Sequence, residues 1–502
     1  MYKKFTLSWS EISNSGYFYE NFLIKINFLF IFTQIRGTIR STVRIIIPGV
    51  IDLTTKDYIN RVLDTVREKH SDKYEFVKTL EEFFPTLEPY LDEHPEIEEN
   101  AILELLAEPE RVIQFRVPWQ DDDGKFHVNL AWRVQYNSAL GPYKGGIRFH
   151  QSVNESISRF LGFEQTFKNA LTQLPLGGAK GGADFNPRGK SDSEIMRFVQ
   201  SFMLEMHKYL GPNLDVPAGD IGVGHREIGY MYGQYKRLNH SEPGVITGKP
   251  VHIGGSYGRT EATGYGIVYF VENALKDRDD SLEGKKVVVS GLGQVGKHAI
   301  EKAVDLGAKV VAVGDLEGYL VDENGLDAQI LKAILAPERS EAEKYVEEHP
   351  GAYFVPEKSV WAADIKYDIA LPCATQGEID GDMAENMVEN CGISAIFEGA
   401  NKPTKDTGVK VFVENDILFA PAKAVNAGGV AASGFEMAQN AQHQRWTFEE
   451  VDENVQNTMA NIYNLCSNTA EQYLGNKNDL KAGANIAGFA RVAEAMISHG
   501  LV

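Results

Sequence analysis

The sequence predicts an α/β protein with two domains, and three observations support that prediction. The chain has 502 residues, more than one hydrophobic core usually serves. Hydrophobic residues make up 43% and charged residues 24%, a composition typical of globular proteins. Residues 286–313 predict a strand, a glycine-rich turn, a helix and a second strand, which form a βαβ unit with parallel strands.

Charge and cysteine content limit the class of protein. The formal net charge is −20, so a polyanionic nucleic acid is repelled and is not expected as a partner. The three cysteines, Cys373, Cys391 and Cys466, are too far apart in sequence for a metal-ligand motif or a disulfide framework. We therefore expect a protein of the reducing cytoplasm, with no metal site and no membrane association.

Residues 1–53 are expected to form an extension outside the fold. Residues 1–50 carry six basic and two acidic side chains, in contrast to the acidic remainder. Their apolar run, 21–32, is shorter than the roughly 20 residues of a spanning helix, and no small-residue cleavage site follows it. A targeting or anchoring arm is the alternative. We favour an appended segment whose removal leaves stability and function nearly unchanged.

The first domain is predicted to span residues 54–250. Apolar residues recur there with helical period in some segments and extended patterns in others. The helical segments are 54–70, 76–91, 155–172 and 192–210, and the extended ones are 112–117 and 126–132. A block punctuated by glycine runs from 141 to 224, and the glycines beside Lys144 and Lys180 indicate that the backbone comes close to another group there.

The second domain is predicted to span residues 251–476 and to have a Rossmann-type fold. A helix near 262–276 precedes the strand 286–290, and the strand 309–313 completes the βαβ unit.

Residues 477–502 are expected to form a C-terminal helix that returns to the first domain. Its apolar residues have helical spacing and need a surface to cover them: Ile486, Phe489, Val492 and Met496.

A G-x-G-x-x-G motif lies between the two strands of the βαβ unit, in the run Gly291-Leu292-Gly293-Gln294-Val295-Gly296. The motif alone is a weak signal, but a strand before it and a helix after it make a dinucleotide site the expected function. Gly291 permits a tight turn, Gly293 lets the backbone approach a pyrophosphate, and Gly296 lets the helix pack closely. Asp315, nineteen residues after Gly296, is placed to bind a ribose hydroxyl.

Three lysines and one aspartate in the glycine block are candidates for chemistry. Lys144 and Lys180 are flanked by glycines, Lys168 lies among apolar neighbours, and Asp220 lies in a similar glycine-rich turn. A lysine that loses solvation has a lowered pKa and can act as a base near neutral pH. Each residue alone is more often a turn or solvated residue. Together, upstream of a dinucleotide fold, they favour a site for a dianionic substrate.

From about residue 54 to the C-terminus, the chain resembles the hexameric glutamate dehydrogenases of the Glu/Leu/Phe/Val dehydrogenase family, most closely the bacterial NADP-using type. The segments that carry the resemblance are 141–150, 163–172, 176–185, 217–224, 261–266 and 426–437. They occur in the expected order and at compatible spacing. The resemblance implies a reversible oxidative deamination of L-glutamate to 2-oxoglutarate and ammonia with a nicotinamide cofactor.

The resemblance also assigns roles to single residues. Lys180 activates water or stabilises the carbinolamine oxygen, and Asp220 carries protons to and from ammonia and the imine. The distal carboxylate of glutamate is held by Lys144 and Ser433, and the carboxylate beside the reacting carbon by Lys168 and Gln165. The side-chain pocket is lined by Ala218 and Val430, with Asn401 and Asn426 nearby.

For the cofactor, the resemblance implies that Thr263 contacts the nicotinamide amide and that the turn 291–296 holds the phosphates. Asp315 is followed by Leu316 and Glu317, which argues against a 2′-phosphate contact, whereas Arg188 and Arg339 are basic residues that could approach one. We expect NADP, with NAD as the alternative.

Two other functions remain open. A related dehydrogenase for apolar amino acids lacks a cation for the distal end of the substrate, so Lys144 and Ser433 argue against it. A catalytically silent scaffold relative is expected to lose the proton-transfer residues, yet Lys180 and Asp220 are present.

The resemblance further implies a homohexamer in which the first domain makes most subunit contacts.

Overall fold

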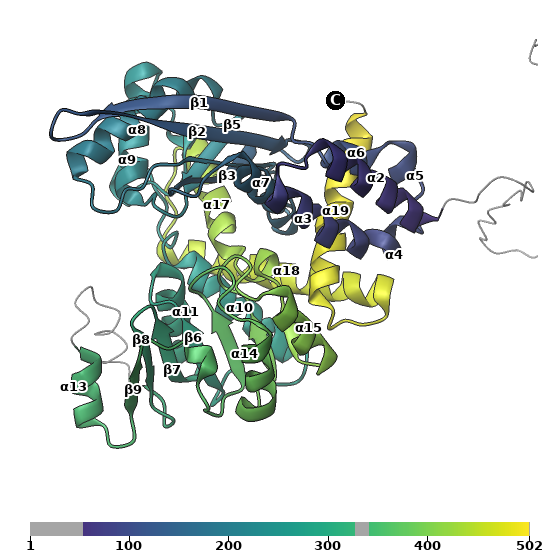
Figure 1. Ribbon diagram of the computed structural model, residues 1–502, viewed down its shortest axis with the longest axis vertical. Helices are drawn as coiled ribbons and strands as arrows, with labels where there is room; N and C mark the ends of the chain where they lie inside the picture. Colours follow the sequence, from purple (N-terminus) through teal and green to yellow (C-terminus); the bar gives the residue numbers. More distant parts are fainter. Residues whose placement is uncertain (1–53, 327–340, 501–502) are drawn as a thin grey trace, which may run out of the picture. The chain divides into compact units, whose positions relative to one another are not determined.

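The computed structural model describes residues 54–326 and 341–500, which form an N-terminal and a C-terminal α/β domain (Figure 1). The extension 1–53 and Arg339 lie outside the described residues. Within those residues, none of the helices is long and apolar enough to cross a membrane.

The N-terminal domain is built on a five-stranded sheet with the order β1-β2-β4-β3-β5. β1 and β2 form an antiparallel hairpin, β2 pairs antiparallel with β4, and β3 lies parallel to both β4 and β5. The strands are β1 (Arg111–Gln120), β2 (Phe126–Asn137), β3 (Tyr143–Phe149), β4 (Gly178–Ala183) and β5 (Asp215–Gly219). β3 is therefore the strand between the two others that carry candidate residues.

Helices cover both faces of this sheet. One core lies between the sheet, α7 and the N-terminal helices, and a second lies between the sheet, α8 and α9. The segment predicted as one helix over 76–91 is divided by a 3-10 turn at Pro85. The helical elements are α2 (Thr55–Lys69), α3 (Tyr74–Phe83), η1 (Phe84–Leu87), α4 (Glu88–Leu91), α5 (Glu96–Glu99), α6 (Ile102–Leu106), α7 (Glu155–Leu171), α8 (Asp192–Met206), η2 (His207–Tyr209), α9 (His225–Leu238), η3 (Pro243–Val245) and η4 (Val251–Ile253).

Lys144 and Lys180 are neither turn residues nor solvated residues, which corrects the interpretation of each lysine taken alone. Both lysines lie in central strands, in β3 and β4, and both are buried. The glycines are required by close packing between backbones: a Cβ on Gly145 would lie 1.6 Å from the carbonyl oxygen of Ala179. Only glycine permits this approach.

The C-terminal domain confirms the expected Rossmann-type unit. Its seven-stranded sheet has the order β12-β11-β10-β6-β7-β8-β9, and the five strands from β12 to β7 are parallel. β8 and β9 add an antiparallel extension. The strands are β6 (Lys286–Ser290), β7 (Lys309–Asp315), β8 (Gly318–Val321), β9 (Tyr353–Pro356), β10 (Ile369–Pro372), β11 (Ala395–Phe397) and β12 (Leu418–Ala420).

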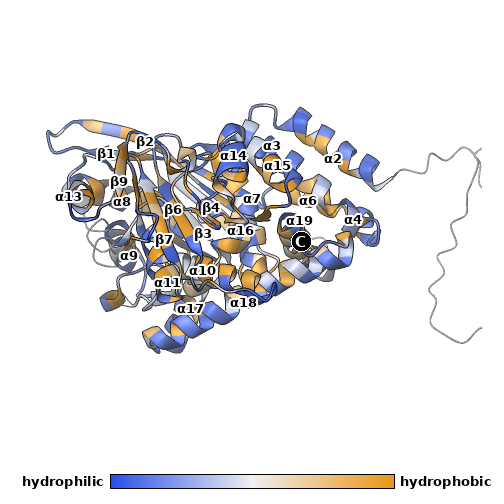
Figure 2. Ribbon diagram, turned by 90° about the horizontal axis from the view of Figure 1, so that it is seen from below, coloured by the Kyte–Doolittle hydropathy of each residue, from blue (hydrophilic) through white to orange (hydrophobic). Residues whose placement is uncertain are grey.

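Burial on both faces explains why β6 is a continuous apolar run. Val287 and Val289 face the core that includes α10 and α11, whereas Val288 faces the opposite core beside α14 and α15. Figure 2 shows many of the surrounding helices with one hydrophobic and one hydrophilic side. The remaining elements are α10 (Ala262–Lys276), α11 (Gln294–Asp305), α13 (Glu341–Glu348), η5 (Val360–Ala362), α14 (Gly381–Asn386), η6 (Met387–Cys391), α15 (Asp406–Glu414), α16 (Ala422–Val425), α17 (Gly428–Gln442), α18 (Phe448–Leu474) and α19 (Leu480–His499).

The connection order of the parallel strands creates a natural binding crevice. β7 follows β6 on one side, whereas β10 pairs with β6 on the other side after a long excursion. Ligands of doubly wound sheets bind outside the carboxyl ends of strands at such a reversal. The turns that follow β6 and β10 are therefore the expected edge of a cofactor site.

The C-terminal helix α19 links the two domains. It contacts α18 and also packs against α7, η1 and α6 of the N-terminal domain. Ile486, Phe489 and Val492 are fully buried in the core formed by α2, α3 and α7, and Met496 packs at its edge. The domains therefore share part of one hydrophobic core.

We predict that Phe489→Ala lowers the free energy of unfolding by about 3–5 kcal/mol, because it leaves a cavity in that shared core. Denaturant unfolding of the purified protein measures the change. Ser498→Ala, at an exposed position of the same helix, is the control and should shift stability by less than about 0.5 kcal/mol. Equal stability of the two variants would contradict the packing of α19.

Candidate active site

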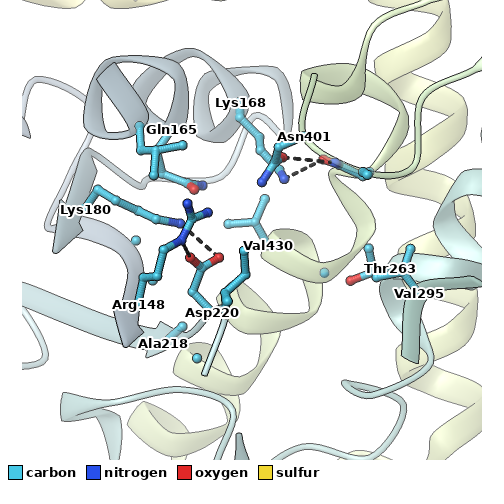
Figure 3. Close-up of a pocket in the computed structure, with 18 of the residues that line it drawn as sticks. Arg148, Gln165, Lys168, Lys180, Ala218, Asp220, Thr263, Val295, Asn401 and Val430 are labelled. Carbon is cyan, nitrogen blue, oxygen red and sulfur yellow. Dashed lines mark hydrogen bonds and ion pairs between the residues drawn. The ribbon is translucent and has the colours of Figure 1, made fainter. Parts of the chain in front are cut away.

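A cavity of about 420 Å³ lies between the two domains, beside the carboxyl ends of β6 and β10 (Figure 3). It brings together most of the predicted site residues: Lys144, Gln165, Lys168, Lys180, Ala218, Asp220, Thr263, Val295, Asn401, Asn426, Val430 and Ser433. The other predicted residues do not line it: Arg188, Gly291, Gly293, Gln294, Gly296 and Asp315.

A lysine–aspartate pair lies on the N-terminal wall of the cavity. Lys180 of β4 places its Nζ 3.1 Å from Oδ1 of Asp220, which follows β5. The other carboxylate oxygen, Oδ2, accepts a hydrogen bond of 2.7 Å from Nε of Arg148 on β3. Figure 3 shows both cations converging on the carboxylate. A Cβ on Gly146 would lie 2.9 Å from Cβ of Asp220 and 3.3 Å from Nζ of Lys180, so this glycine leaves the space in which the pair meets.

Burial and charge act in opposite directions on the Asp220 carboxylate. Burial raises its pKa, but the charges of Lys180 and Arg148 and their hydrogen bonds outweigh burial and hold the pKa at about 2. Burial lowers the pKa of Lys180, and Asp220 partly opposes that shift. The pair is thus an ionised carboxylate beside a lysine that releases its proton more readily than a solvated one.

A second group of cations lies where Lys144 enters the cavity. Lys144 is 1% exposed, and burial, together with the charges of Arg259 and Arg133, lowers its pKa to about 7. Ser433 of α17 accepts a hydrogen bond of 2.9 Å from Nε of Arg259 and donates one of 3.1 Å to the Gly429 carbonyl. The Ser433 hydroxyl is therefore held by Arg259, which the sequence analysis did not single out.

Helix α7 contributes a third polar group. Lys168 donates a hydrogen bond to Oδ1 of Asn426 in the C-terminal domain, and burial together with the charge of Lys180 lowers its pKa to about 7. The amide of Asn426 donates to the Gly399 carbonyl at 2.9 Å and to Oδ1 of Asn401 at 3.3 Å. Gln165 lies one turn before Lys168 on the same helix and faces the same cavity.

The charge of the lining is strongly unbalanced. Among the described residues that line the cavity, Asp220 is the only acid. The cations of the lining are Lys144, Arg148, Lys168, Lys180, Arg259 and Lys402. Lys402 is 39% exposed and pairs with Glu82 at 2.8 Å, so the buried excess comes from the other five cations. A cavity with this excess suits a small ligand with more than one negative charge.

The turn after β6 fits a dinucleotide. A Cβ on Gly291 would lie 2.6 Å from Cα of Ala374, and one on Gly296 would lie 1.8 Å from the Gly291 carbonyl oxygen, so both positions require glycine. Gly293 faces open space, and no side chain of the described residues caps the N-terminus of α11. Free backbone N–H groups beside an open glycine suit a pyrophosphate. Thr263 and Val295 border the cavity next to this turn.

Two predicted cofactor residues lie at a distance from the cavity lining. Asp315 ends β7 and its carboxylate accepts a hydrogen bond from the backbone N–H of Glu317 at 2.8 Å. Arg188 lies after β4 and lines a separate open hollow that reaches Asp220 from another side. Arg188 therefore lies near the turn that carries Asp220.

Arg148, Arg259 and Lys402 were missed by the sequence analysis. Arg148 could have been found: once 143–149 is a strand, the alternation of side chains places it on the same face as Lys144 and Gly146. Arg259 carried no such signal, because its partner Ser433 is 174 residues away.

A doubly wound sheet with a dinucleotide turn, facing a cavity with a lysine–aspartate pair, defines the class of dinucleotide-dependent oxidoreductases that act on small anionic substrates. Family models narrow the class. The model for the Glutamate/Leucine/Phenylalanine/Valine dehydrogenase matches residues 254–500, and the model for the Glu/Leu/Phe/Val dehydrogenase dimerisation domain matches 109–237. The chain belongs to the glutamate/leucine/phenylalanine/valine dehydrogenase family.

Individual relatives agree with the family models. The chain is 49% identical over 443 residues to the NAD(P)-specific glutamate dehydrogenase of Xylanibacter ruminicola, covering 88% of this chain and 99% of the relative. It is 48% identical to the NADP-specific glutamate dehydrogenase of Escherichia coli, covering 88% and 98%. The crystal structure of Plasmodium falciparum glutamate dehydrogenase is similar with a TM-score of 0.85 and 47% identity, covering 89% of this chain and 96% of the other.

We predict that Gly146→Ala lowers dehydrogenase turnover by about 10²-fold, because the added methyl displaces Asp220 or Lys180 and misplaces the reacting groups. Steady-state rates and the thermal midpoint are measured on the same preparation. Gly229→Ala is the matched control, since a Cβ at this position of α9 meets no atom within 4 Å. Full activity of Gly146→Ala would show that the pair tolerates the methyl group.

Proposed function

We propose that this protein is a glutamate dehydrogenase, which interconverts L-glutamate with 2-oxoglutarate and ammonia. The observation that supports this proposal is the pair of cationic groups, at Lys144 and at Lys168, on a cavity that also holds the Lys180–Asp220 pair. A substrate with two carboxylates needs two separate cationic contacts. The reacting carbon then lies beside the residues that transfer protons.

The family resemblance assigns the proposed substrate contacts to side chains of the cavity wall. Lys144 and Ser433 would hold the distal carboxylate, and Lys168 with Gln165 would hold the carboxylate next to the reacting carbon. Ala218 and Val430 supply apolar surface for the methylene groups between them. The contacts between the substrate carboxylates and these lysines are stronger in the buried cavity than the same contacts would be in water.

The chemistry assigns separate roles to Lys180 and Asp220. With its lowered pKa, Lys180 accepts and returns a proton at the water or carbinolamine oxygen, and its charge stabilises that oxygen when it becomes negative. Asp220 transfers protons to and from the nitrogen. A bound nicotinamide supplies the hydride acceptor and donor. The protein's part is to hold the reacting carbon against that ring in a cavity that excludes water.

For the cofactor we propose NADP, with NAD as the alternative. Gly291, Gly293, Gln294, Val295 and Gly296 would hold the phosphates, and Thr263 would contact the nicotinamide amide, near Asn401 and Asn426. Asp315 would approach the ribose and Arg188 a 2′-phosphate. Relatives of this chain are named NAD(P)-specific, NADP-specific and NAD-specific, so their names support either cofactor. The acidic residues Asp315 and Glu317 at the end of β7 favour NAD.

The direct test is an initial-rate assay of the purified protein with 2-oxoglutarate and ammonium, comparing NADPH with NADH. The proposed function predicts turnover with at least one cofactor, and the NADP proposal predicts the higher kcat/KM with NADPH. 2-Oxo-4-methylpentanoate, the keto acid of leucine, replaces 2-oxoglutarate as the control substrate. A preference for that apolar keto acid would overturn the assignment to glutamate.

We also propose a homo-oligomer, specifically a homohexamer, assembled mainly through the N-terminal domain. Phe126, Val128 and Leu130 point to one side of the β1–β2 hairpin and are 78%, 65% and 39% exposed. An apolar stripe on a sheet face is typical of a surface that contacts another subunit. One matched family model is named for a dimerisation domain. Light scattering that gives a stable monomer at working concentration would contradict this proposal.

We predict that Lys144→Leu raises the KM for glutamate and for 2-oxoglutarate by a factor equivalent to about 2–5 kcal/mol, because a buried carboxylate loses its cation. The variant should also gain relative activity with apolar amino acids. Lys410→Leu, whose side chain is 72% exposed on α15, is the matched control and should match wild type. Unchanged glutamate kinetics in Lys144→Leu would show that the contact is misassigned.

We predict that Asp220→Asn slows turnover by about 10²–10⁴-fold, because an amide cannot carry a proton between nitrogen and water. Cofactor binding should persist, since the phosphate-binding turn belongs to the other domain. Steady-state rates and fluorescence titration with NADPH are measured on the same variant, with the exposed Asp122→Asn as control. Wild-type turnover would remove Asp220 from the mechanism, and loss of both activities would point to a structural role.

A further inference from the structure

We propose that Arg148 is a positioning residue for proton transfer: it holds one oxygen of Asp220 so that the other faces Lys180, and its permanent charge sets the pH range in which that pair works. This inference rests on the proposed function. It concerns a residue that lies beside the reacting groups without having been assigned a role in the catalytic steps above.

The geometry divides the Asp220 carboxylate between two cations. Nε of Arg148 donates to Oδ2 at 2.7 Å, and Nζ of Lys180 lies 3.1 Å from Oδ1. The side chains of Arg148 and Asp220 are 13% and 16% exposed, so water competes little for either contact. With Oδ2 occupied by Arg148, the carboxylate is held with Oδ1 toward Lys180 (Figure 3).

The backbone connects the same two elements. β3 lies between β4 and β5 in the sheet, so Arg148 belongs to the strand between those that lead to Lys180 and to Asp220. The backbone N–H of Phe149 donates to the Ile221 carbonyl at 2.9 Å, which anchors the turn one residue after Asp220 to the residue after Arg148. The carboxylate is thus tied to β3 through both its backbone and its side chain.

Lys180 and Arg148 differ in whether they can release a proton. A lysine ammonium can lose its proton, and burial makes that easier for Lys180. A guanidinium stays protonated at any pH at which the protein is folded. Lys180 can therefore exchange a proton during the cycle, whereas the Arg148 charge is constant and keeps Asp220 oriented at each step.

The constant charge of Arg148 also shifts the pKa values of Asp220 and Lys180 in the same direction. The positive charge of Arg148 lowers the pKa of Asp220 and the pKa of Lys180. The other charged groups of the cavity lining are cations: Lys144 of β3, Lys168 of α7, and Arg259 and Lys402 of the C-terminal domain. Arg133 of β2 also lowers the pKa of Lys180. The hollow on the other side of Asp220 is lined by Arg188, Arg226 and one acid, Glu227, which forms an ion pair with Arg226. These groups are the same in the wild type and in the Arg148 variants, so they do not change the sign of the Arg148 effect. Removing the Arg148 charge therefore raises both pKa values.

The test is the pH profile of kcat and kcat/KM for Arg148→Gln, with Arg148→Met as a second uncharged variant and Arg148→Lys as the charge-conserving one. We expect the limbs of the profile to move to higher pH by about 1–3 units in the uncharged variants, the size of shift that one nearby charge produces. Arg148→Lys should keep the limbs near their wild-type positions while lowering kcat. Because the two groups are coupled, each limb belongs to the pair and not to one residue.

Two controls separate the possible outcomes. Arg197→Gln makes the same substitution on α8, where Arg197 binds Asp122 and the Gln120 carbonyl outside the cavity, and its profile should match wild type. NADPH affinity, measured by fluorescence, should be unchanged in the folded Arg148 variants. Uncharged variants whose rates fall equally at every pH, or do not fall or shift at all, would overturn the inference. Failure of both uncharged variants to fold while Arg148→Lys folds would make Arg148 a structural residue and would also overturn it.

Failure of the proposed function has a different signature. A wild-type protein without turnover on 2-oxoglutarate and ammonium contradicts the proposed function before any variant is compared. A wild-type protein with turnover, together with Arg148→Gln limbs that do not move, leaves the proposed function intact and contradicts only the role of Arg148.

Discussion

The close packing of β4, β3 and β5 is the constraint on which the site depends. A methyl group at Gly145 would meet the Ala179 carbonyl, and one at Gly146 would meet Asp220 and Lys180. Because these backbones are so close, the side chains of Lys180 and Arg148, on β4 and β3, meet that of Asp220, which directly follows β5. The reacting groups can therefore meet because Gly145 and Gly146 have no side chains.

The same packing buries several cations together, and nearby acidic residues neutralise some of them. Burying cations in a cavity with one acid is unfavourable unless partners neutralise them. Two fully buried pairs lie in the layer behind the cavity, Arg133 with Asp215 and Lys249 with Glu436. Asp215 and Glu436 also raise the pKa of Lys144, which burial lowers. The positive charge that remains unpaired faces the cavity and is available to a ligand.

The sequence predicted the parts of the fold that rest on local patterns, and failed where the pattern is missing. The βαβ unit around β6 and the glycine turn after it carry strong local signals, and the structure has both. β3 and β4 were not predicted as strands, because glycine has low strand propensity and hides the alternation of side chains. Their strand conformation is stabilised by partners distant in sequence, as in the pairing of Lys144 with Val216.

In the candidate site, too, the residues with a local sequence signal were predicted and those without one were not. Lys144, Lys168, Lys180 and Asp220 were found because their glycine-rich or apolar neighbours are unusual for charged residues. Arg148 and Arg259 have ordinary neighbours, and their importance depends on partners 72 and 174 residues away. The roles of the residues in the turn 291–296, and of Asp315 and Arg188, remain predictions that a cofactor-binding measurement must test.

Contacts across the domains explain how substrate binding and domain arrangement can be coupled. α7 carries Lys168, which binds Asn426, and four residues earlier Glu164, which lies 3.1 Å from Lys423 of α16. Lys423 and Asn426 are themselves three residues apart, so the two contacts join one face of α7 to one turn of the other domain. The Glu164 and Lys423 side chains are 21% and 12% exposed, whereas the outer pair of Lys78 with Asp406 is 47% and 61% exposed. Exposed pairs contribute little to stability, so the inner contacts are the stronger link between the domains. Lys168 lines the cavity and also takes part in these contacts, so a ligand that binds Lys168 acts on the same face of α7 that joins the two domains.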